Sequence, residues 1–182
     1  MYIDPTVYQG RPSDDRIPQE LAVYDKLEEL GISFTRVDHD HADTMEDCHV
    51  IDACLNATVC KNLFLCNRQK TNFYLLMMPG DKPFKTKELS HQLGIARLSF
   101  ASPEDMEQYL DCTPGSSSIM GLANDAENKV QLLMDEDIKA GEYLGCHPCI
   151  NTSSLKLRTA DVLETFLPAV HHEPIFVHLT GE

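Results

Sequence analysis

The chain has 182 residues, of which 15 are basic and 29 acidic, so its formal net charge is −14. An apolar content of 42% with ordinary amounts of glycine and proline excludes a disordered or fibrous chain. The longest apolar run, Phe73–Met78, is far shorter than the roughly 20 residues of a membrane helix, and the first residues do not resemble a signal peptide. We therefore expect a globular, cytoplasmic protein of one domain, residues 1–182, that contacts no membrane.

The first third of the chain predicts an arm, a helix, a strand and a second helix. Residues 1–16 are polar and lack periodicity, so we expect an irregular N-terminal arm. A helix with apolar positions at helical spacing follows and ends at Gly31. A strand over Ile32–Val37 comes next. Thr44 and Asp47 have the spacing of a capping box and predict the start of another helix.

The remaining chain predicts strands interspersed with short helices. The apolar runs Thr58–Cys66 and Phe73–Met78 predict an antiparallel strand pair. The later expected elements are a helix over Thr86–Leu93, a strand over Arg97–Ala101, a helix starting at Ser102-Pro103, a structured loop over 113–125, strands over Lys129–Met134, Tyr143–Cys146 and Ser153–Leu157, and a last helix capped by Thr159 and stopped by Pro168. Without regular βαβ alternation, this order predicts an α+β fold, a mixed, largely antiparallel sheet flanked by helices.

Two patterns suggest thiol or metal chemistry. Cys146-His147-Pro148-Cys149 has the spacing of a redox dithiol, or of half a zinc site, but neither a long helix nor a second ligand pair follows it. Asp38-His39-Asp40-His41 could supply metal ligands, although a charge-rich loop is the simpler interpretation, as it is for His171-His172. We expect no metal and no cofactor.

Two further patterns could bind an anion. Lys61 heads an apolar run, where it is either a lysine that extends to solvent from a strand end or a cation directed into a pocket. The loop Thr113-Pro114-Gly115-Ser116-Ser117-Ser118 offers backbone N–H groups and hydroxyls that could approach a phosphate or a developing oxyanion.

The charge is unevenly distributed along the chain. Seven basic and two acidic residues lie within Lys61–Arg97, so this segment carries +5 and the rest of the chain carries −19. Phosphate binding depends mainly on lysine and arginine. The overall acidity therefore restricts a nucleic-acid contact to a small area and does not exclude it.

Four segments in series resemble one family. They are Lys61-Asn62-Leu63-Phe64-Leu65, Arg97-Leu98-Ser99-Phe100-Ala101-Ser102-Pro103-Glu104, Thr113-Pro114-Gly115-Ser116 with Gly121-Leu122, and His147-Pro148 with Asn151-Thr152. Their order and spacing are similar to those of the YbaK/prolyl-tRNA-synthetase-associated editing domains, in particular the free-standing ProX (PrdX-like) members. The match spans roughly residues 19–178.

The resemblance implies a trans-editing enzyme that hydrolyses the ester of mischarged tRNA(Pro), most often Ala-tRNA(Pro). A synthetase pocket rejects a smaller amino acid poorly, because each missing methylene weakens binding by only about 1–3 kcal/mol. A second, size-limited site that hydrolyses the wrong product is therefore needed. The expected partners are the acceptor end of tRNA(Pro) and either prolyl-tRNA synthetase or an elongation factor, with no DNA.

The resemblance also implies roles for individual residues. Lys61, Gly115 and His147 would be catalytic: Lys61 anchors the terminal adenosine or its phosphate, Gly115 belongs to the loop that orients the scissile carbonyl, and His147 lies beside the aminoacyl pocket, as a base or as an orienting donor. The expected substrate-binding residues are Thr44, Met45, Asn62, Arg97, Ser99, Ser116, Ser118 and Asn151.

Other interpretations stay open at this point. Ile119-Met120 replaces a Pro-Phe pair of relatives, which leaves alanine, cysteine and serine esters as candidates. The chain could also be a non-catalytic protein that binds proline or aminoacyl-tRNA on the same fold, or a thiol or metal module centred on Cys146 and Cys149.

Overall fold

Four helices begin close to the residues that the sequence predicts. The computed structural model describes residues 1–182 and places them at α1 Pro18–Glu29, α2 Met45–Leu55, α3 Thr86–Leu93 and α4 Pro103–Leu110. At α2 both capping-box bonds form between Thr44 and Asp47, and at α4 the Ser102 hydroxyl accepts the Asp105 N–H. Local capping chemistry therefore fixes these helix starts.

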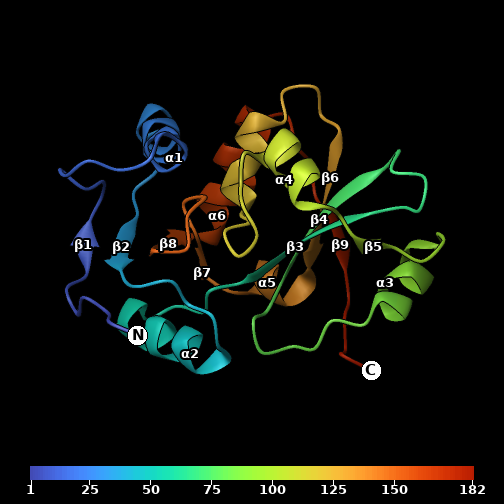
Figure 1. Cartoon of the computed structure of the whole chain (residues 1–182), viewed down its shortest axis with the longest axis horizontal. Coiled ribbons are helices and arrows are strands. Elements are labelled where there is room, and N and C mark those ends of the chain that lie inside the picture. Colours follow the sequence, from blue (N-terminus) through green and yellow to red (C-terminus); the bar gives the residue numbers. More distant parts are fainter.

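The strands form two sheets, in an α+β arrangement as predicted (Figure 1). The first sheet is antiparallel and has the order β1 Tyr8–Gln9, β2 Thr35–Asp38, β8 Ser153–Arg158 and β7 Tyr143–Cys146. The second is mixed and has the order β5 Ser99–Phe100, β3 Lys61–Cys66, β4 Phe73–Met78, β6 Val130–Asp135 and β9 Ile175–Val177. The antiparallel pairing of β3 with β4 is confirmed, while β4, β6 and β9 pair in parallel.

Several predicted boundaries are wrong. The strand expected over Ile32–Val37 is the shorter β2, which begins only at Thr35; Ile32 and Phe34 precede it and pack into the core. The strand expected over Arg97–Ala101 is reduced to β5, which pairs only with Leu65 and Cys66. The segment 1–16 contributes the two-residue strand β1 to the first sheet.

The C-terminal helix also differs from its prediction. Arg158 is the N-cap and Thr159 the first helical residue of α6 Thr159–Asp161, which continues through a π-helical turn over Val162–Phe166 into α7 Leu167–Ala169. Pro168 therefore lies inside the helical segment. In the π turn the Leu167 N–H bonds the carbonyl five residues earlier, and this wider turn precedes a proline that has no N–H to donate.

Besides β1, three elements were not predicted. They are the 3₁₀ helix Ile119–Asn124, the short helix α5 Glu136–Ala140 and the strand β9. The 3₁₀ helix lies within the glycine- and serine-rich loop, and β9 extends the second sheet beside β6.

Gly145 joins the two sheets. It lies in β7 and forms a bridge to Val59, with its carbonyl accepting from the Cys60 N–H and its N–H donating to the Thr58 carbonyl, both at 3.0 Å. A Cβ on Gly145 would lie 2.9 Å from both the Thr58 carbonyl oxygen and the Val59 Cα. Only glycine allows the two backbones to approach this closely.

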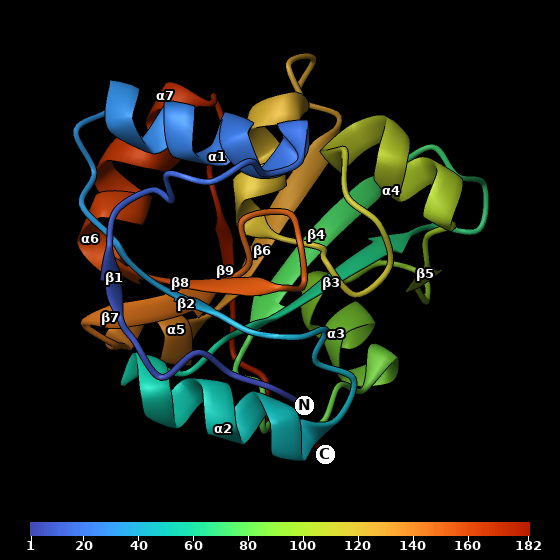
Figure 2. The ribbon, with the colours of Figure 1, turned by 60° about the vertical axis from the view of Figure 1, so that its left-hand side comes forward.

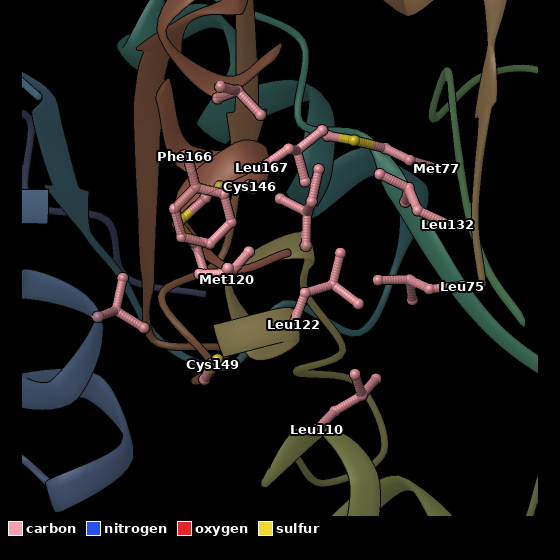
Figure 3. Packing of buried hydrophobic residues seen from close by; sticks show 14 of the residues in the cluster. Leu75, Met77, Leu110, Met120, Leu122, Leu132, Cys146, Cys149, Phe166 and Leu167 are labelled. Carbon is pink, nitrogen blue, oxygen red and sulfur yellow. The ribbon is translucent and has the colours of Figure 1, made fainter. Parts of the chain in front are cut away.

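A shared core of 29 buried residues packs the sheets against the helices. Figure 3 shows part of it, with Phe166, Met120 and Cys146 close together and Leu75 and Leu132 further along. A second cluster of eight buried residues, including Leu65 and Leu89, packs α3 against the other face of the second sheet. In Figure 2, α1 lies above the first sheet and α2 below it. No helix combines the length and apolar character that crossing a bilayer requires.

Candidate active site

An open cavity of about 800 Å³ lies where the two sheets meet, at the start of β3. In Figure 1 the loop that follows α4 descends between β8 and β3, with α2 below. The polar lining comes mainly from five places: the linker into α2, the start of β3, the Gly80-Asp81 turn, the Gly115 loop and the loop before β8. Apolar side chains from α2, β3, β5 and α4 complete the wall, together with His49 and Asp52 of α2.

Lys61 enters this cavity from the first position of β3. Its ammonium donates a hydrogen bond of 2.6 Å to the backbone carbonyl of Lys82 and has no carboxylate partner. The nearby acids Asp135 and Asp137 are instead held by Lys82, whose ammonium lies 2.8 Å from each. Lys61 therefore lines the cavity without a direct ion pair, although Asp43, Asp52 and Asp81 line the same cavity.

His147 lines the cavity, and one of its ring nitrogens is hydrogen-bonded to the backbone. Its Nδ1 lies 2.9 Å from the Ser153 carbonyl oxygen, which can only accept, so Nδ1 carries the proton. Burial lowers the pKa of His147 to about 4, so the ring is neutral at pH 7. Its Nε2 therefore keeps a lone pair and acts as a hydrogen-bond acceptor or a base. This argues against the orienting-donor role.

A second histidine supports this tautomer. The Nδ1 of His39 lies 2.7 Å from the Asp40 carbonyl oxygen, which makes its Nε2 the acceptor of the Ser154 hydroxyl at 2.9 Å. The Ser154 oxygen in turn lies 3.4 Å from Nδ1 of His147. The backbone carbonyls of Asp40 and Ser153 thus fix which atom donates in each hydrogen bond between His39, Ser154 and His147.

Three buried polar atoms on cavity residues have no partner. They are Oδ1 of Asn62, Oγ of Ser117 and Oδ1 of Asn151. Buried polar atoms in folded proteins are nearly always hydrogen-bonded, and an orphan costs about 1–3 kcal/mol. All three residues line the cavity, which makes them candidates to pair with a polar ligand.

Gly115 brings the loop after α4 close to the opposite wall. Its φ is +87°, a conformation that other residues rarely adopt. A Cβ there would lie 3.5 Å from both the Asn151 amide nitrogen and the His41 ring. The Asn151 amide also donates to the Ala42 carbonyl at 3.0 Å, so three separate segments of the chain meet at this point.

Five of the expected site residues lie outside the cavity lining. Thr44 caps α2, and only its neighbour Met45 reaches the cavity. Arg97 and Ser99 are exposed beside it, because Phe100 is the β5 residue that lines it. The Ser116 hydroxyl donates to the Thr113 carbonyl at 2.8 Å, and that of Ser118 donates to the His147 carbonyl at 2.5 Å.

The serine that faces the cavity is instead Ser117, which the sequence did not single out. His41 was also missed as a site residue: it lines the cavity, and its Nδ1 lies 2.8 Å from Asp43. Which side chains of an irregular loop face a cavity cannot be inferred from sequence. His41 could have been found, because it belongs to the run Asp38-His39-Asp40-His41 that the sequence singled out.

The thiol pair does not have the properties of a redox centre. Burial raises the pKa of Cys146 to about 12, and the neighbouring Cys112 thiol together with burial raises the pKa of Cys149. Both cysteines are free and buried, and Figure 3 shows Cys146 beside Phe166. A reactive dithiol needs the opposite, an exposed thiol with a lowered pKa. The chain contains no group of three or more histidine, cysteine, aspartate or glutamate side chains placed to hold a metal ion.

Comparisons with known proteins identify the family. Residues 39–165, which include every cavity residue from His41 to Asn151, match the family described as "Aminoacyl-tRNA editing domain". The chain belongs to this family. It is an aminoacyl-tRNA deacylase of the editing-domain type.

Relatives of the editing domain cover most of the chain. The "Prolyl-tRNA editing protein ProX" of Acetoanaerobium sticklandii is 32% identical over 141 residues, 78% of this chain and 86% of that protein. The "Prolyl-tRNA synthetase associated domain-containing protein 1" of Danio rerio is 29% identical over 153 residues, 83% of this chain and 82% of that protein. A crystal structure described as a candidate trans-editing enzyme for prolyl tRNA synthetase shares the fold, with a TM-score of 0.67, 13% identity and coverage of 91% and 100%.

Proposed function

We propose that this editing domain acts in trans on mischarged tRNA(Pro) and that alanine is the amino acid it removes. The observation that carries the proposal is the convergence on one cavity of Lys61, His147 and three residues that each carry an unpartnered polar atom. The identity to a prolyl-tRNA editing protein supports the choice of tRNA. We propose that the whole chain works as a single editing unit.

The proposed reaction is hydrolysis of an ester. A water molecule attacks the carbonyl carbon, the oxyanion intermediate collapses, and the bond to the terminal ribose oxygen breaks, releasing alanine and a free hydroxyl on the tRNA. An aminoacyl ester is already reactive, so orientation and polarisation of the carbonyl supply most of the catalysis. No metal is needed for any of these steps.

Each cavity group has a part in this scheme. Lys61 stays charged and binds the phosphate of the terminal nucleotide. Backbone N–H groups of the loop at Gly115 polarise the scissile carbonyl, which explains why the chain approaches so closely there. Nε2 of His147 accepts a hydrogen bond from the attacking water or from the substrate amine. Asn62, Ser117 and Asn151 pair their orphan atoms with polar groups of the ribose and the base.

A deacylation panel tests the proposal. Ala-, Cys-, Ser- and Pro-tRNA(Pro) are incubated with excess enzyme without added metal, and release of each amino acid is followed against spontaneous hydrolysis. We expect rapid release of alanine and intact Pro-tRNA(Pro). Tight binding without turnover of any ester would favour a non-catalytic binding protein, and faster release of cysteine or serine would overturn the preference for alanine. Delivery by prolyl-tRNA synthetase or an elongation factor stays a prediction.

A further inference from the structure

Phe100 is a large aromatic side chain left exposed at the rim of the cavity. It is 64% exposed, although it also contributes to the cavity lining. Its ring meets that of Phe84 edge-on, with centroids 6.0 Å apart and an angle of 68° between planes. The Phe84 ring thus supports one side of Phe100, while the rest of the Phe100 ring faces solvent.

Phe100 lies on the same face of the second sheet as Lys61. In the antiparallel pairing of β5 with β3, Phe100 stands directly opposite Leu65. Residues four apart along a strand point to the same face, so Lys61 and Leu65 share a face, and Phe100 shares it too. Because Leu65 on this face is buried against α3, a ligand that contacts Lys61 reaches Phe100 through the cavity, which both residues line.

Three exposed cations flank the aromatic pair. The Thr86 hydroxyl donates to the Leu98 carbonyl at 2.8 Å, which places Lys85 and Lys87 next to Arg97. None of the three has a carboxylate partner, although the chain as a whole carries −14. We call Phe84, Lys85, Lys87, Arg97 and Phe100 the rim surface.

The combination of ring and cations favours one kind of ligand. Single-stranded nucleic acid is bound by aromatic rings on which bases stack and by cations that contact the backbone phosphates. Phe100 lies on the rim of the cavity proposed to hold the terminal nucleotide, so the next nucleotide of the same strand is favoured over a protein partner or a second copy of the chain. Resting on the proposed function, we propose that Phe100 stacks on the base next to the terminal adenosine of the unpaired tRNA 3′ end, while Arg97 and the two lysines contact its phosphates.

Paired substrates test this proposal. The first is alanyl-adenosine, which fills only the cavity, and the second is alanyl-cytidylyl-adenosine, which adds the neighbouring nucleotide. For wild-type enzyme we expect kcat/KM to be higher on the dinucleotide. Phe100→Ala should lower kcat/KM on the dinucleotide and on Ala-tRNA(Pro) roughly tenfold, as expected for the loss of one stacked base, and have a much smaller effect on alanyl-adenosine.

Further variants separate stacking from packing. Phe100→Tyr should keep the wild-type rate and Phe100→Leu should behave like Phe100→Ala, with unchanged melting temperature in all three because the side chain is exposed. Tyr143→Ala, which removes an exposed aromatic ring from the first sheet, is the matched control and should have no effect.

If the proposed function is wrong, the wild-type enzyme itself will be inactive. A failure of the proposal about Phe100 looks different, because the wild type is then active. With an active wild type, an equal loss on alanyl-adenosine would mean that Phe100 acts inside the cavity, and no loss on any substrate would remove its role altogether. If Phe100→Ala instead changed the molecular mass in solution and left deacylation intact, the rim surface would be a contact between copies. Each of these results would overturn the proposal.

Discussion

At the scale of single residues, neighbours from distant parts of the chain fix the state of the cavity side chains. The proton of His147 is placed by the Ser153 carbonyl, and Lys61 is oriented by the Lys82 carbonyl. Lys82 is itself held by Asp135, which is fully buried. None of these partners can be inferred from sequence spacing, although the sequence did predict that Lys61 and His147 lie at one site, and both line the cavity.

The protonation of His147 can be measured directly. Its lowered pKa predicts that the ring titrates near pH 4, and that above this pH the NMR shifts of its nitrogens report a proton on Nδ1 only. An unfolded histidine titrates near 6.5, so the unfolded chain binds more protons between these values, and the free energy of unfolding should fall as the pH drops from 6.5 towards 4. His147→Gln assigns the signal. Titration near 6.5, or a proton on Nε2, would refute this account of the site.

At the scale of elements, the sequence predicts what local chemistry decides. Capping residues locate the starts of α2 and α4, and the apolar runs identify β3 and β4. It fails where tertiary packing decides. The short strand β5 is defined only by its partner β3, and the π turn arises where the last helix runs through Pro168. Likewise, Ser117 rather than Ser116 or Ser118 faces the cavity because the other two hydroxyls bond within the protein.

The junction of the sheets gives a prediction at this scale. Gly145→Ala would place a Cβ 2.9 Å from the backbone at Thr58 and Val59, and two paired backbones cannot yield without breaking their hydrogen bonds. We expect a loss of about 1–3 kcal/mol in the free energy of unfolding, measured by urea denaturation. Gly141→Ala is the matched control, because its Cβ would meet nothing nearer than 3.4 Å. Equal stability of the two variants would contradict the close-contact argument.

At the scale of the whole molecule, the charge pattern governs how tRNA can approach. The chain carries −14, yet the segment Lys61–Arg97 is basic and supplies both Lys61 and the cations of the rim surface. The sequence revealed this segregation, and the structure adds that Lys85, Lys87 and Arg97 are exposed and without acidic partners. The acidic remainder should limit contact to the end of the acceptor stem.

A small cationic footprint predicts moderate salt dependence. If about three phosphates are contacted, log kcat/KM for Ala-tRNA(Pro) should fall with log salt concentration with a slope of about −2. Lys85→Glu should lower kcat/KM at low salt and reduce the slope, whereas Lys129→Glu, an exposed lysine outside the basic segment, should change both much less. A rate indifferent to salt, or equal effects of the two variants, would contradict the assigned footprint.

The central claim is that the cavity at the start of β3 hydrolyses Ala-tRNA(Pro), and one measurement tests it most directly. Single-turnover release of alanine is followed with excess wild-type enzyme, Lys61→Ala and the control Lys129→Ala, after circular dichroism has confirmed that all three are folded. We predict that the wild type and Lys129→Ala release alanine at the same rate and that Lys61→Ala is slower by at least tenfold. Undiminished activity of a folded Lys61→Ala variant would contradict the account.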